Sequence, residues 1–291
     1  MLGVALALVS ATAFGVMPVM TKVVYSDDAE PIGVLAVRFW LAALVLLVLA
    51  RLRGEALPRG RSLQALLLLG GVGYVAQSLT FFFALERISA GLTTLLLYFY
   101  PAVVVVLAAV LVRERPRPVA AVCVVAATLG IALTIGPVEG GEVAGVLLGL
   151  LSALAYALYV LGNSRVTGVG PFATAATVMS ACALVYGVLA LAARPQLPSA
   201  GSAWLALIGV ALIGTVLAMT TFFAALTRLG PSDTSVVSTV EPVVSVGVAA
   251  LVLGERLGSL QLAGGVLVLL AVGVLAKVGS ARRAGHEEVP V

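Results

Sequence analysis

Glu241 is the residue best placed to do chemistry, because it stands alone as a carboxylate near the middle of the long apolar segment 232–253. In a membrane, such a charge costs about 2.5–3.5 kcal/mol on insertion scales and is by default a candidate functional group. Glu241 could exchange a proton with a cavity or contact the amine of a substrate. It could instead be a structural carboxyl, hydrogen-bonded to backbone that the adjacent Pro242 exposes.

Two prolines, Pro101 and Pro242, interrupt apolar segments that are otherwise helical in pattern. A proline has no N–H and leaves the carbonyl one turn earlier without its helical partner. In membrane helices a freed carbonyl is tolerated where it faces protein or a wet cavity. We therefore expect helix breaks at both prolines that mark a binding site, with simple packing kinks as the alternative.

Arg38 is a cation inside the apolar segment 32–50. Its long side chain could extend to the membrane surface, or it could face a cavity and bind a carboxylate. A direct pairing with Glu241 is a third arrangement that the sequence allows.

Further polar and aromatic side chains lie within apolar segments and are candidates to line a cavity. Such residues also form interfacial belts or bridge helices, so each has a structural alternative. The set comprises Phe14, Gln77, Thr80, Tyr98, Tyr100, Tyr156, Tyr159 and Asn163.

The composition indicates that these residues lie in a membrane. Of 291 residues, 62% are hydrophobic and only 10% are charged, with a mean hydropathy of +1.18. A soluble domain is closer to half apolar and a quarter charged, and its surface still needs polar cover. The net charge of +4 does not indicate nucleic acid as a partner, since the basic residues fall between apolar segments.

Ten apolar runs are each long enough to cross about 30 Å of hydrocarbon. The predicted spans are 2–24, 32–50, 63–85, 90–112, 118–136, 143–163, 171–193, 203–227, 232–253 and 259–277. With ten spans, most loop arginines fall on one face, whereas nine or eleven spans would divide them between both faces. The positive-inside rule then places both termini in the cytoplasm, and we expect the plasma membrane as the location.

An internal repeat divides the chain in two. Residues 81–115 align without a gap on residues 222–256, which pairs Pro101 with Pro242. Each half therefore holds five helices, and an odd number forces the second half to enter the membrane inverted. We predict an all-α transmembrane fold of two inverted five-helix repeats around a central cavity. The expected boundaries are 1–137 for the first repeat, 138–278 for the second and 279–291 for a cytoplasmic tail.

The repeat also pairs Glu114-Arg115 with Glu255-Arg256, at equivalent helix ends on opposite faces. Surface ion pairs of this kind contribute little individually. We expect these residues to form interfacial ion pairs or to cap neighbouring helices, in structural roles.

These residues resemble a known family. The second half carries Glu241-Pro242, Leu253-Gly254-Glu255-Arg256-Leu257, Gln261-Leu262-Ala263-Gly264-Gly265 and Gly273, and the first half carries Arg38, Tyr100-Pro101, Arg113-Glu114-Arg115 and Gly130. The pattern resembles two tandem EamA domains of the drug/metabolite transporter superfamily, over nearly the whole chain. The resemblance implies a cavity formed mainly by the first, third, fourth, sixth, eighth and ninth spans, and a cargo such as an amino acid or a related metabolite.

We therefore predict a secondary-active transporter that exports amino acids or similar small amphipathic metabolites by alternating access. A channel or facilitator for small solutes is the alternative, although rings of identical charge are absent from the sequence. An enzyme is not indicated, because the apolar segments hold no histidine and no paired carboxylates. The expected partners are the lipid bilayer, a small-molecule substrate and, as a candidate coupling ion, the proton. No cofactor or metal is expected, and the protein could be a monomer or a homodimer.

Overall fold

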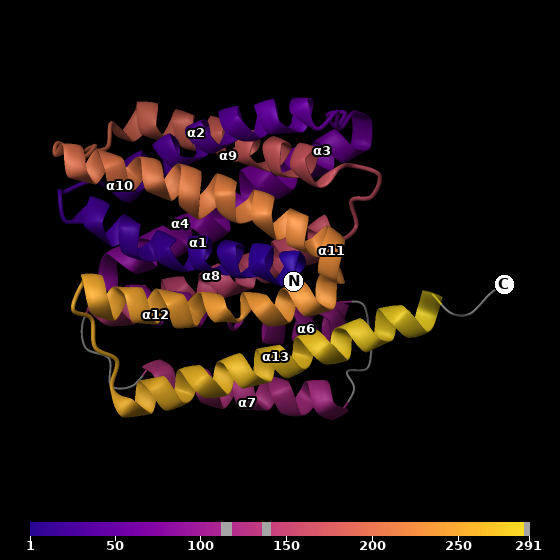
Figure 1. The fold of residues 1–291 in the computed structure, drawn as a ribbon. Coiled ribbons are helices and arrows are strands. Elements are labelled where there is room, and N and C mark those ends of the chain that lie inside the picture. Colours follow the sequence, from indigo (N-terminus) through magenta and orange to yellow (C-terminus); the bar gives the residue numbers. More distant parts are fainter. Residues whose placement is uncertain (112–117, 136–140, 288–291) are drawn as a thin grey trace.

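The computed structural model describes residues 1–111, 118–135 and 141–287, and the regular elements within these ranges are all helices. Figure 1 shows them running side by side, with the N- and C-termini both toward the right-hand end. Several sequence predictions lie outside the described residues. They concern Arg113, Glu114, Arg115, Arg117, the span ends at 112 and 136, the repeat boundary at 137–138, and residues 288–291.

The first five spans include two that are not regular α-helices along their whole length. The third span contains a π-helical turn, and the fourth is broken at Tyr98–Phe99. The elements are α1 (Leu2–Tyr25), α2 (Pro31–Leu52), α3 (Gly60–Leu68), η1 (Leu69–Tyr74), α4 (Val75–Arg87), α5 (Ala90–Leu97), α6 (Tyr100–Leu111) and α7 (Pro118–Ile135).

The second five spans repeat these irregularities at equivalent places. The eighth span contains a π-helical turn, and the ninth is broken at Thr239. The elements are α8 (Gly141–Asn163), α9 (Pro171–Ala193), α10 (Gly201–Ala211), η2 (Leu212–Leu217), α11 (Ala218–Ser238), α12 (Val240–Val252) and α13 (Ser259–Glu287). Within α11 the chain turns sharply at Gly230, whose φ of +77° suits a residue without a Cβ atom.

The prediction of an all-α fold with ten helices is confirmed. Among the described residues, nine helices are long and apolar enough to cross a membrane, and the shorter apolar helix α12 contributes to the tenth. Two boundaries differ from the prediction. The segment 232–253 is divided between the end of α11 and α12, and α13 continues to Glu287 instead of ending at 277. Residues 279–287 of the predicted tail are therefore helical, although Gly279 and Gly285 are weak helix formers.

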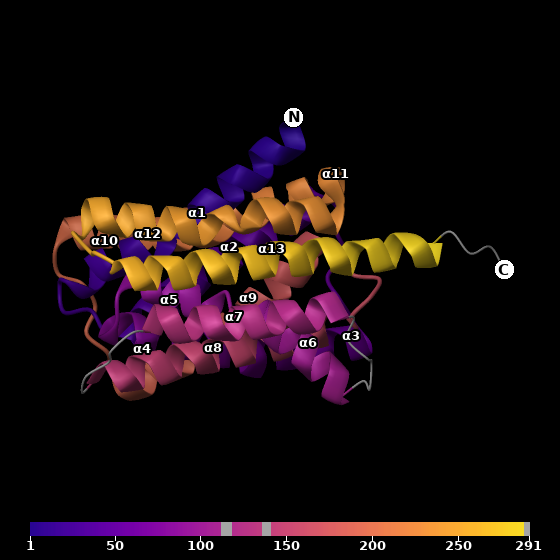
Figure 2. The same cartoon turned by 90° about the horizontal axis from the view of Figure 1, so that it is seen from below.

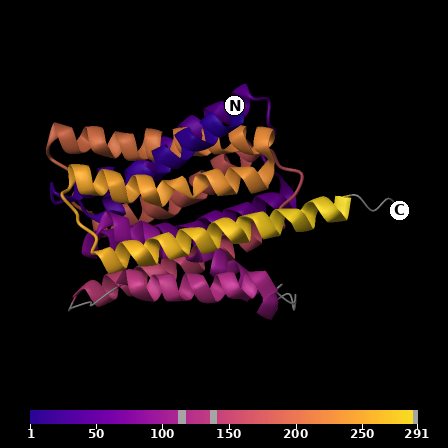
Figure 3. The same cartoon turned by 60° about the horizontal axis from the view of Figure 1, so that its bottom comes forward.

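Each helix of the first half packs against a helix of the second half. The most extensive pairs are α7 with α13, α2 with α9, α1 with α11, α4 with α8, and α1 with α12. Figures 2 and 3 show α7 and α13 side by side along one edge, with the end of α13 projecting beyond the other helices. The halves are therefore interleaved, and neither forms a separate layer.

Two glycines allow α7 and α13 to approach closely. A Cβ atom on Gly264 would lie 2.5 Å from the carbonyl oxygen of Gly130 and 2.7 Å from the backbone nitrogen of Thr134. Those neighbours are backbone atoms, which cannot move aside as a flexible side chain can. Small residues at such a crossing permit the van der Waals packing that holds membrane helices together.

We predict that Gly264→Ala lowers the free energy of unfolding by about 1–3 kcal/mol, the usual effect of overpacking. The matched control is Gly273→Ala in the same helix, where an added Cβ atom meets nothing within 4 Å. Reversible unfolding of both variants in mixed micelles measures the difference. Equal stability of the two variants would contradict the close approach.

Three loop carboxylates cap helices that belong to the opposite half. Glu255 accepts hydrogen bonds from the backbone nitrogens of Ala90 (2.9 Å) and Gly91 (3.3 Å) at the start of α5. Glu55 accepts one from Ala173 (2.7 Å) in the first turn of α9. A helix N-terminus has unpaired N–H groups and a partial positive charge, so a carboxylate satisfies both. The expectation that Glu255 caps a neighbouring helix agrees with this geometry.

Asp27 is the third of these caps, and it lies in the loop between α1 and α2. Its Oδ2 atom accepts from the backbone nitrogens of Ala200 (2.8 Å) and Ser199 (2.6 Å), at the start of α10. These hydrogen bonds, with the Ala200 contribution largest, lower the pKa of the Asp27 carboxyl below its ordinary value of 3.8. The cap therefore favours the charged carboxylate.

We predict that this cap makes stability depend on pH. Because the pKa of Asp27 is lowered by folding, its stabilisation is fully present above pH 3.8 and is lost as the pH falls through the folded-state pKa. Asp27→Asn keeps a capping oxygen but cannot titrate, so wild type should exceed the variant in melting temperature at pH 5–7, roughly the range where the carboxyl is ionised. The gap should narrow toward pH 3, roughly one unit below the ordinary carboxyl value.

Melting in detergent across this pH range measures both proteins, and Asp28→Asn serves as the control. Asp28 is exposed and has a positive φ of 57°, which asparagine also tolerates. A gap between wild type and Asp27→Asn that stays constant with pH would refute the prediction.

Candidate functional site

The two broken spans place a proline at the start of a half-helix. Pro101 is the second residue of α6, and Pro242 is the third residue of α12. In the first turn a helix has no internal acceptor for its N–H groups, so the missing donor of proline has no cost there. Both prolines, which the sequence marked as break positions, therefore lie just after the breaks at Tyr98–Phe99 and Thr239.

The carbonyl that Pro242 leaves without a helical donor belongs to Ser238, four residues earlier. The hydroxyl of Tyr98, at the break of the other half, lies 2.9 Å from this carbonyl oxygen and 2.9 Å from Oε2 of Glu241, and donates toward both. Tyr98 is 7% exposed, and Glu241 is partly buried in the first turn of α12. The two breaks thus meet at one tyrosine hydroxyl.

Aromatic rings extend from this contact across the interface between the halves. Successive ring centroids are 6.4 Å apart for Tyr98–Tyr100, 4.7 Å for Tyr100–Tyr156 and 6.0 Å for Tyr156–Tyr159. The row continues from Tyr159 to Tyr74 at 5.1 Å. The four predicted tyrosines, Tyr98, Tyr100, Tyr156 and Tyr159, therefore form one cluster, which also includes a fifth that was not predicted.

Arg38 lies at the far end of this row. The ring of Tyr74 is 6.0 Å from that of Phe39, and the Arg38 guanidinium lies 5.0 Å from the Phe39 ring and 5.1 Å from the Phe82 ring. Arg38 is only 3% exposed, so its side chain is inside the protein and does not extend to the surface. Within the described ranges, Arg38 and Glu241 do not form an ion pair.

Residues of both π-helical turns lie close to Arg38. Its Nε donates to Oγ1 of Thr215 (2.9 Å) in η2, and the same Thr215 hydroxyl donates to the Val210 carbonyl (3.0 Å). Tyr74 lies in η1, the equivalent turn of the first half. A π turn has i→i+5 backbone hydrogen bonds in place of the α-helical pattern, and such turns are frequent at functional sites.

The remaining predicted residues lie around this cluster or near it. Gln77 is buried, and its Nε2 lies 3.4 Å from Oγ of Ser152. The Oδ1 atom of Asn163, at the end of α8, is buried without a hydrogen-bond partner among the described residues. Phe14 on α1 precedes Gly15, where an added Cβ atom would lie 2.7 Å from the Glu241 carbonyl oxygen.

Thr80 has a local role, since its hydroxyl donates to the Ala76 carbonyl one turn earlier. Two pockets among the described residues, of about 310 and 280 Å³, are lined by neither Glu241 nor Arg38. The predicted central cavity therefore stays a prediction.

Two regions of the chain, residues 1–136 and 143–276, match the description of the EamA-like transporter family. The chain belongs to this family. Both EamA regions coincide with five-span halves, and the predicted organisation in two EamA repeats is confirmed. The protein is therefore a multi-pass membrane transporter and not an enzyme.

One relative is named a transporter, and one solved structure has a similar fold. A protein of Bacillus subtilis (strain 168) named "Uncharacterized transporter YcbK" is 25% identical over 272 residues, which cover 88% of this chain and 87% of the relative. A solved structure described only as "Crystal structure of protein" has a TM-score of 0.66 and 18% identity, and covers 95% of this chain and 97% of its own. At that identity the likeness shows the fold alone.

Thr215, Ser238 and Tyr74 complete the site in this EamA transporter, and sequence reasoning missed them. Tyr74 and Thr215 are equivalent if the gapless repeat alignment is extended seven residues toward the N-terminus, so the signal was present. Ser238 follows from Pro242, as the carbonyl that a proline leaves unpaired. The π turns themselves had no local sequence signal that we can identify.

We predict that Thr215→Val lowers the free energy of unfolding by about 1–3 kcal/mol, because it leaves a buried charged donor without its acceptor. The control is Thr128→Val, an exposed residue whose hydroxyl donates only to the Val124 carbonyl of its own helix (2.8 Å). That change should stay within about 0.5 kcal/mol. Unfolding titrations of both variants measure the difference, and similar losses would argue against the Arg38–Thr215 contact.

Proposed function

We propose that this EamA transporter is a secondary-active carrier that exports an amino acid or a similar small amphipathic metabolite by alternating access. The observation that carries the proposal is the meeting of the two broken spans at Tyr98, Ser238 and Glu241. Paired half-helices from two repeats are the arrangement in which transporters place substrate and coupling-ion sites.

The positions of the two breaks indicate how a rotation of one half against the other would open the site. One break belongs to each half, and a small rotation of one half against the other would separate the Tyr98 hydroxyl from Ser238 and Glu241. The site would then be exposed to one side of the membrane at a time. An odd number of helices in each half makes the two repeats inverted, which lets the same rotation produce both the inward- and the outward-facing state.

The side chains of the cluster match the groups of an amino acid. Arg38 supplies a cation that has no carboxylate in ion-pair distance within the described residues, and it can bind a carboxylate in a bidentate manner. Glu241 can bind the amine of the cargo. The rings of Tyr100, Tyr156 and Tyr159 provide a surface with apolar faces and polar tips, which suits an amphipathic side chain.

The number of hydrogens available at the Tyr98 hydroxyl supports a proton as the coupling ion. The Tyr98 hydroxyl carries one hydrogen, yet it lies 2.9 Å from two acceptor oxygens, of Ser238 and of Glu241. A proton on the Glu241 carboxyl would supply a hydrogen to the second contact, because the carboxyl could then donate to the Tyr98 oxygen. Cargo amine and proton would compete for the same carboxyl, as exchange transport requires.

We propose the plasma membrane as the location, with both termini in the cytoplasm. The support is the distribution of basic loop residues in a chain with ten spans. The connection between α2 and α3, including the adjacent helix ends, carries Arg51, Arg53, Arg59 and Arg61. It falls on the same side as Arg165 and Arg228. An excess of arginine marks the cytoplasmic face.

Counterflow in proteoliposomes tests this function. Liposomes with wild type, preloaded with each of a panel of amino acids and small amphiphiles, should take up labelled substrate saturably for a few compounds. Glu241→Gln should reduce this exchange by about 10-fold or more, the size of effect expected when a charged contact is lost. The matched control is Glu86→Gln, an exposed carboxylate that pairs with Arg87 (2.9 Å) away from the cluster.

Each outcome has a definite meaning. Saturable exchange that Glu241→Gln leaves unchanged would keep the carrier and remove Glu241 from the mechanism. Fast, non-saturable flux without counterflow would overturn alternating access and favour a channel. Loss of exchange in both glutamate variants would show that the effect is not specific to the site.

A further inference from the structure

A pocket of about 310 Å³ lies apart from the tyrosine cluster, at one end of the helices. Its walls come from the start of α1, the residue that follows α2, the start of α9 and the second half of the α10–η2–α11 span. Because α1 begins at Leu2 and α9 begins at Pro171, the pocket lies where the spans end. In a bilayer this is the level of the lipid headgroups.

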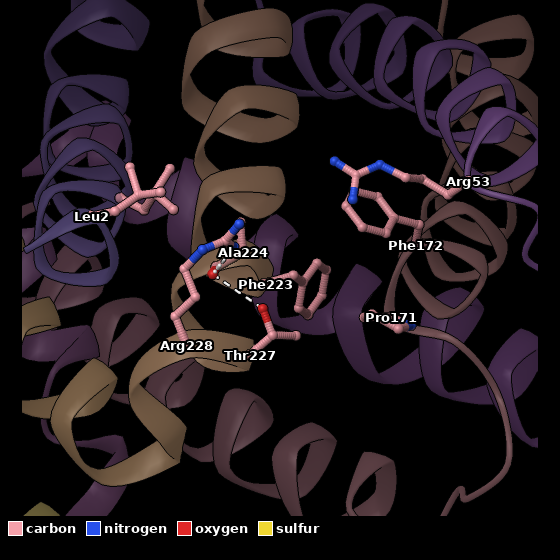
Figure 4. A pocket seen from close by; sticks show the side chains of 9 residues that line it. Leu2, Arg53, Pro171, Phe172, Phe223, Ala224, Thr227 and Arg228 are labelled. Atoms are coloured by element: carbon pink, nitrogen blue, oxygen red, sulfur yellow. Dashed lines mark hydrogen bonds between the residues drawn. The ribbon is translucent and has the colours of Figure 1, made fainter.

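The pocket has an apolar floor and a cationic rim. Figure 4 shows the Arg53 side chain across the ring of Phe172 on one side, and Arg228 on α11 on the other, with Phe223 between them. The Arg53 guanidinium lies 4.8 Å from the Phe172 ring centroid. Leu2 and Leu6 complete the apolar lining.

Both arginines keep their charge available for an anion. Arg228 Nη1 donates to the Ala224 carbonyl (2.8 Å), which orients the guanidinium without neutralising it. Arg53 and Arg228 are exposed, and neither has an ion-pair partner among the described residues. The carboxylate of Glu55 nearby is used in capping α9 through Ala173 (2.7 Å).

We propose that this pocket binds an anionic phospholipid, with the phosphate between Arg53 and Arg228 and an acyl chain against Phe172 and Phe223. Guanidinium groups bind phosphate in a bidentate manner, and basic pockets between transmembrane helices bind anionic headgroups. The shape favours a lipid over the cargo, since the anion site lies at the span ends and the apolar surface continues from it between the helices. None of the residues that we assign to the cargo lines this pocket.

A bound lipid would join two helix pairs. Arg53 and Phe172 belong to the side of α2 and α9, whereas Leu2 and Arg228 belong to the side of α1 and α11. A phosphate held by both arginines therefore links the two pairs at this end. The rings of Phe172 and Phe223 already connect the two pairs here, with centroids 6.0 Å apart, and the lipid would add an ionic link to this apolar contact.

Native mass spectrometry of the full-length protein with phosphatidylglycerol and phosphatidylcholine tests the site. Wild type should retain phosphatidylglycerol in preference to phosphatidylcholine. The double variant Arg53→Gln with Arg228→Gln should weaken phosphatidylglycerol binding by about 10–30-fold, since each basic residue near a headgroup contributes about a factor of five. Replacement of both arginines by lysine should retain most of the binding, because the charge remains.

The matched control replaces Arg59 and Arg61 by glutamine. Both are exposed arginines at the start of α3, outside the pocket, and their loss should leave binding unchanged. Equal weakening in the control would show general surface attraction and overturn the site. Binding that survives the Arg53 and Arg228 glutamine variant would also overturn it.

Competition distinguishes a lipid from a soluble anion. Glycerol 1-phosphate carries the phosphate without the acyl chains and should not displace phosphatidylglycerol at equal concentration. Displacement by glycerol 1-phosphate would assign the pocket to a free phosphate. Displacement by an amino acid that the protein exchanges would assign the pocket to the cargo pathway. Either result would refute the lipid assignment.

Discussion

A backbone carbonyl in a membrane has no water to bind, and this constraint explains where the polar side chains of the chain lie. Pro242 leaves the Ser238 carbonyl without a helical donor, and Tyr98 supplies one from the other half. At the π turn η2, the Thr215 hydroxyl donates to the Val210 carbonyl and accepts from Arg38, which it orients. The hydrogen bonds that Tyr98 and Thr215 make to backbone carbonyls therefore also position the side chains of the site.

The same constraint explains why few polar residues suffice. Tyr98 contacts a freed carbonyl and a carboxyl, and Thr215 contacts the Val210 carbonyl and a guanidinium. Each hydroxyl thus stabilises the irregular helix and positions a charged group. Irregular backbone is tolerated at membrane depth only where protein or a cavity covers it, so it concentrates between the two halves.

The sequence predicted the features that depend on composition and on proline. The apolar runs located the ten helices, and Pro101 and Pro242 located the breaks, because both signals act locally. Arg38 was left open between surface and interior, since its partner Thr215 is 177 residues away and depends on packing. The length of α13 was underestimated because the helix continues past the apolar run. The contact of Tyr98 with Glu241 joins the two halves, so the sequence of neither half alone could predict it.

The capping carboxylates have a consequence for biogenesis. The N-terminus of α5 is capped by Glu255, which is 165 residues later in the chain, and α9 is capped by Glu55 from the first half. A ribosome releases the fourth span long before residue 255 exists, so the nascent first half lacks this cap until the second half is nearly complete. Until then, among the described residues, only the Ser89 side chain, which accepts from the Leu92 nitrogen (3.1 Å), caps the start of α5.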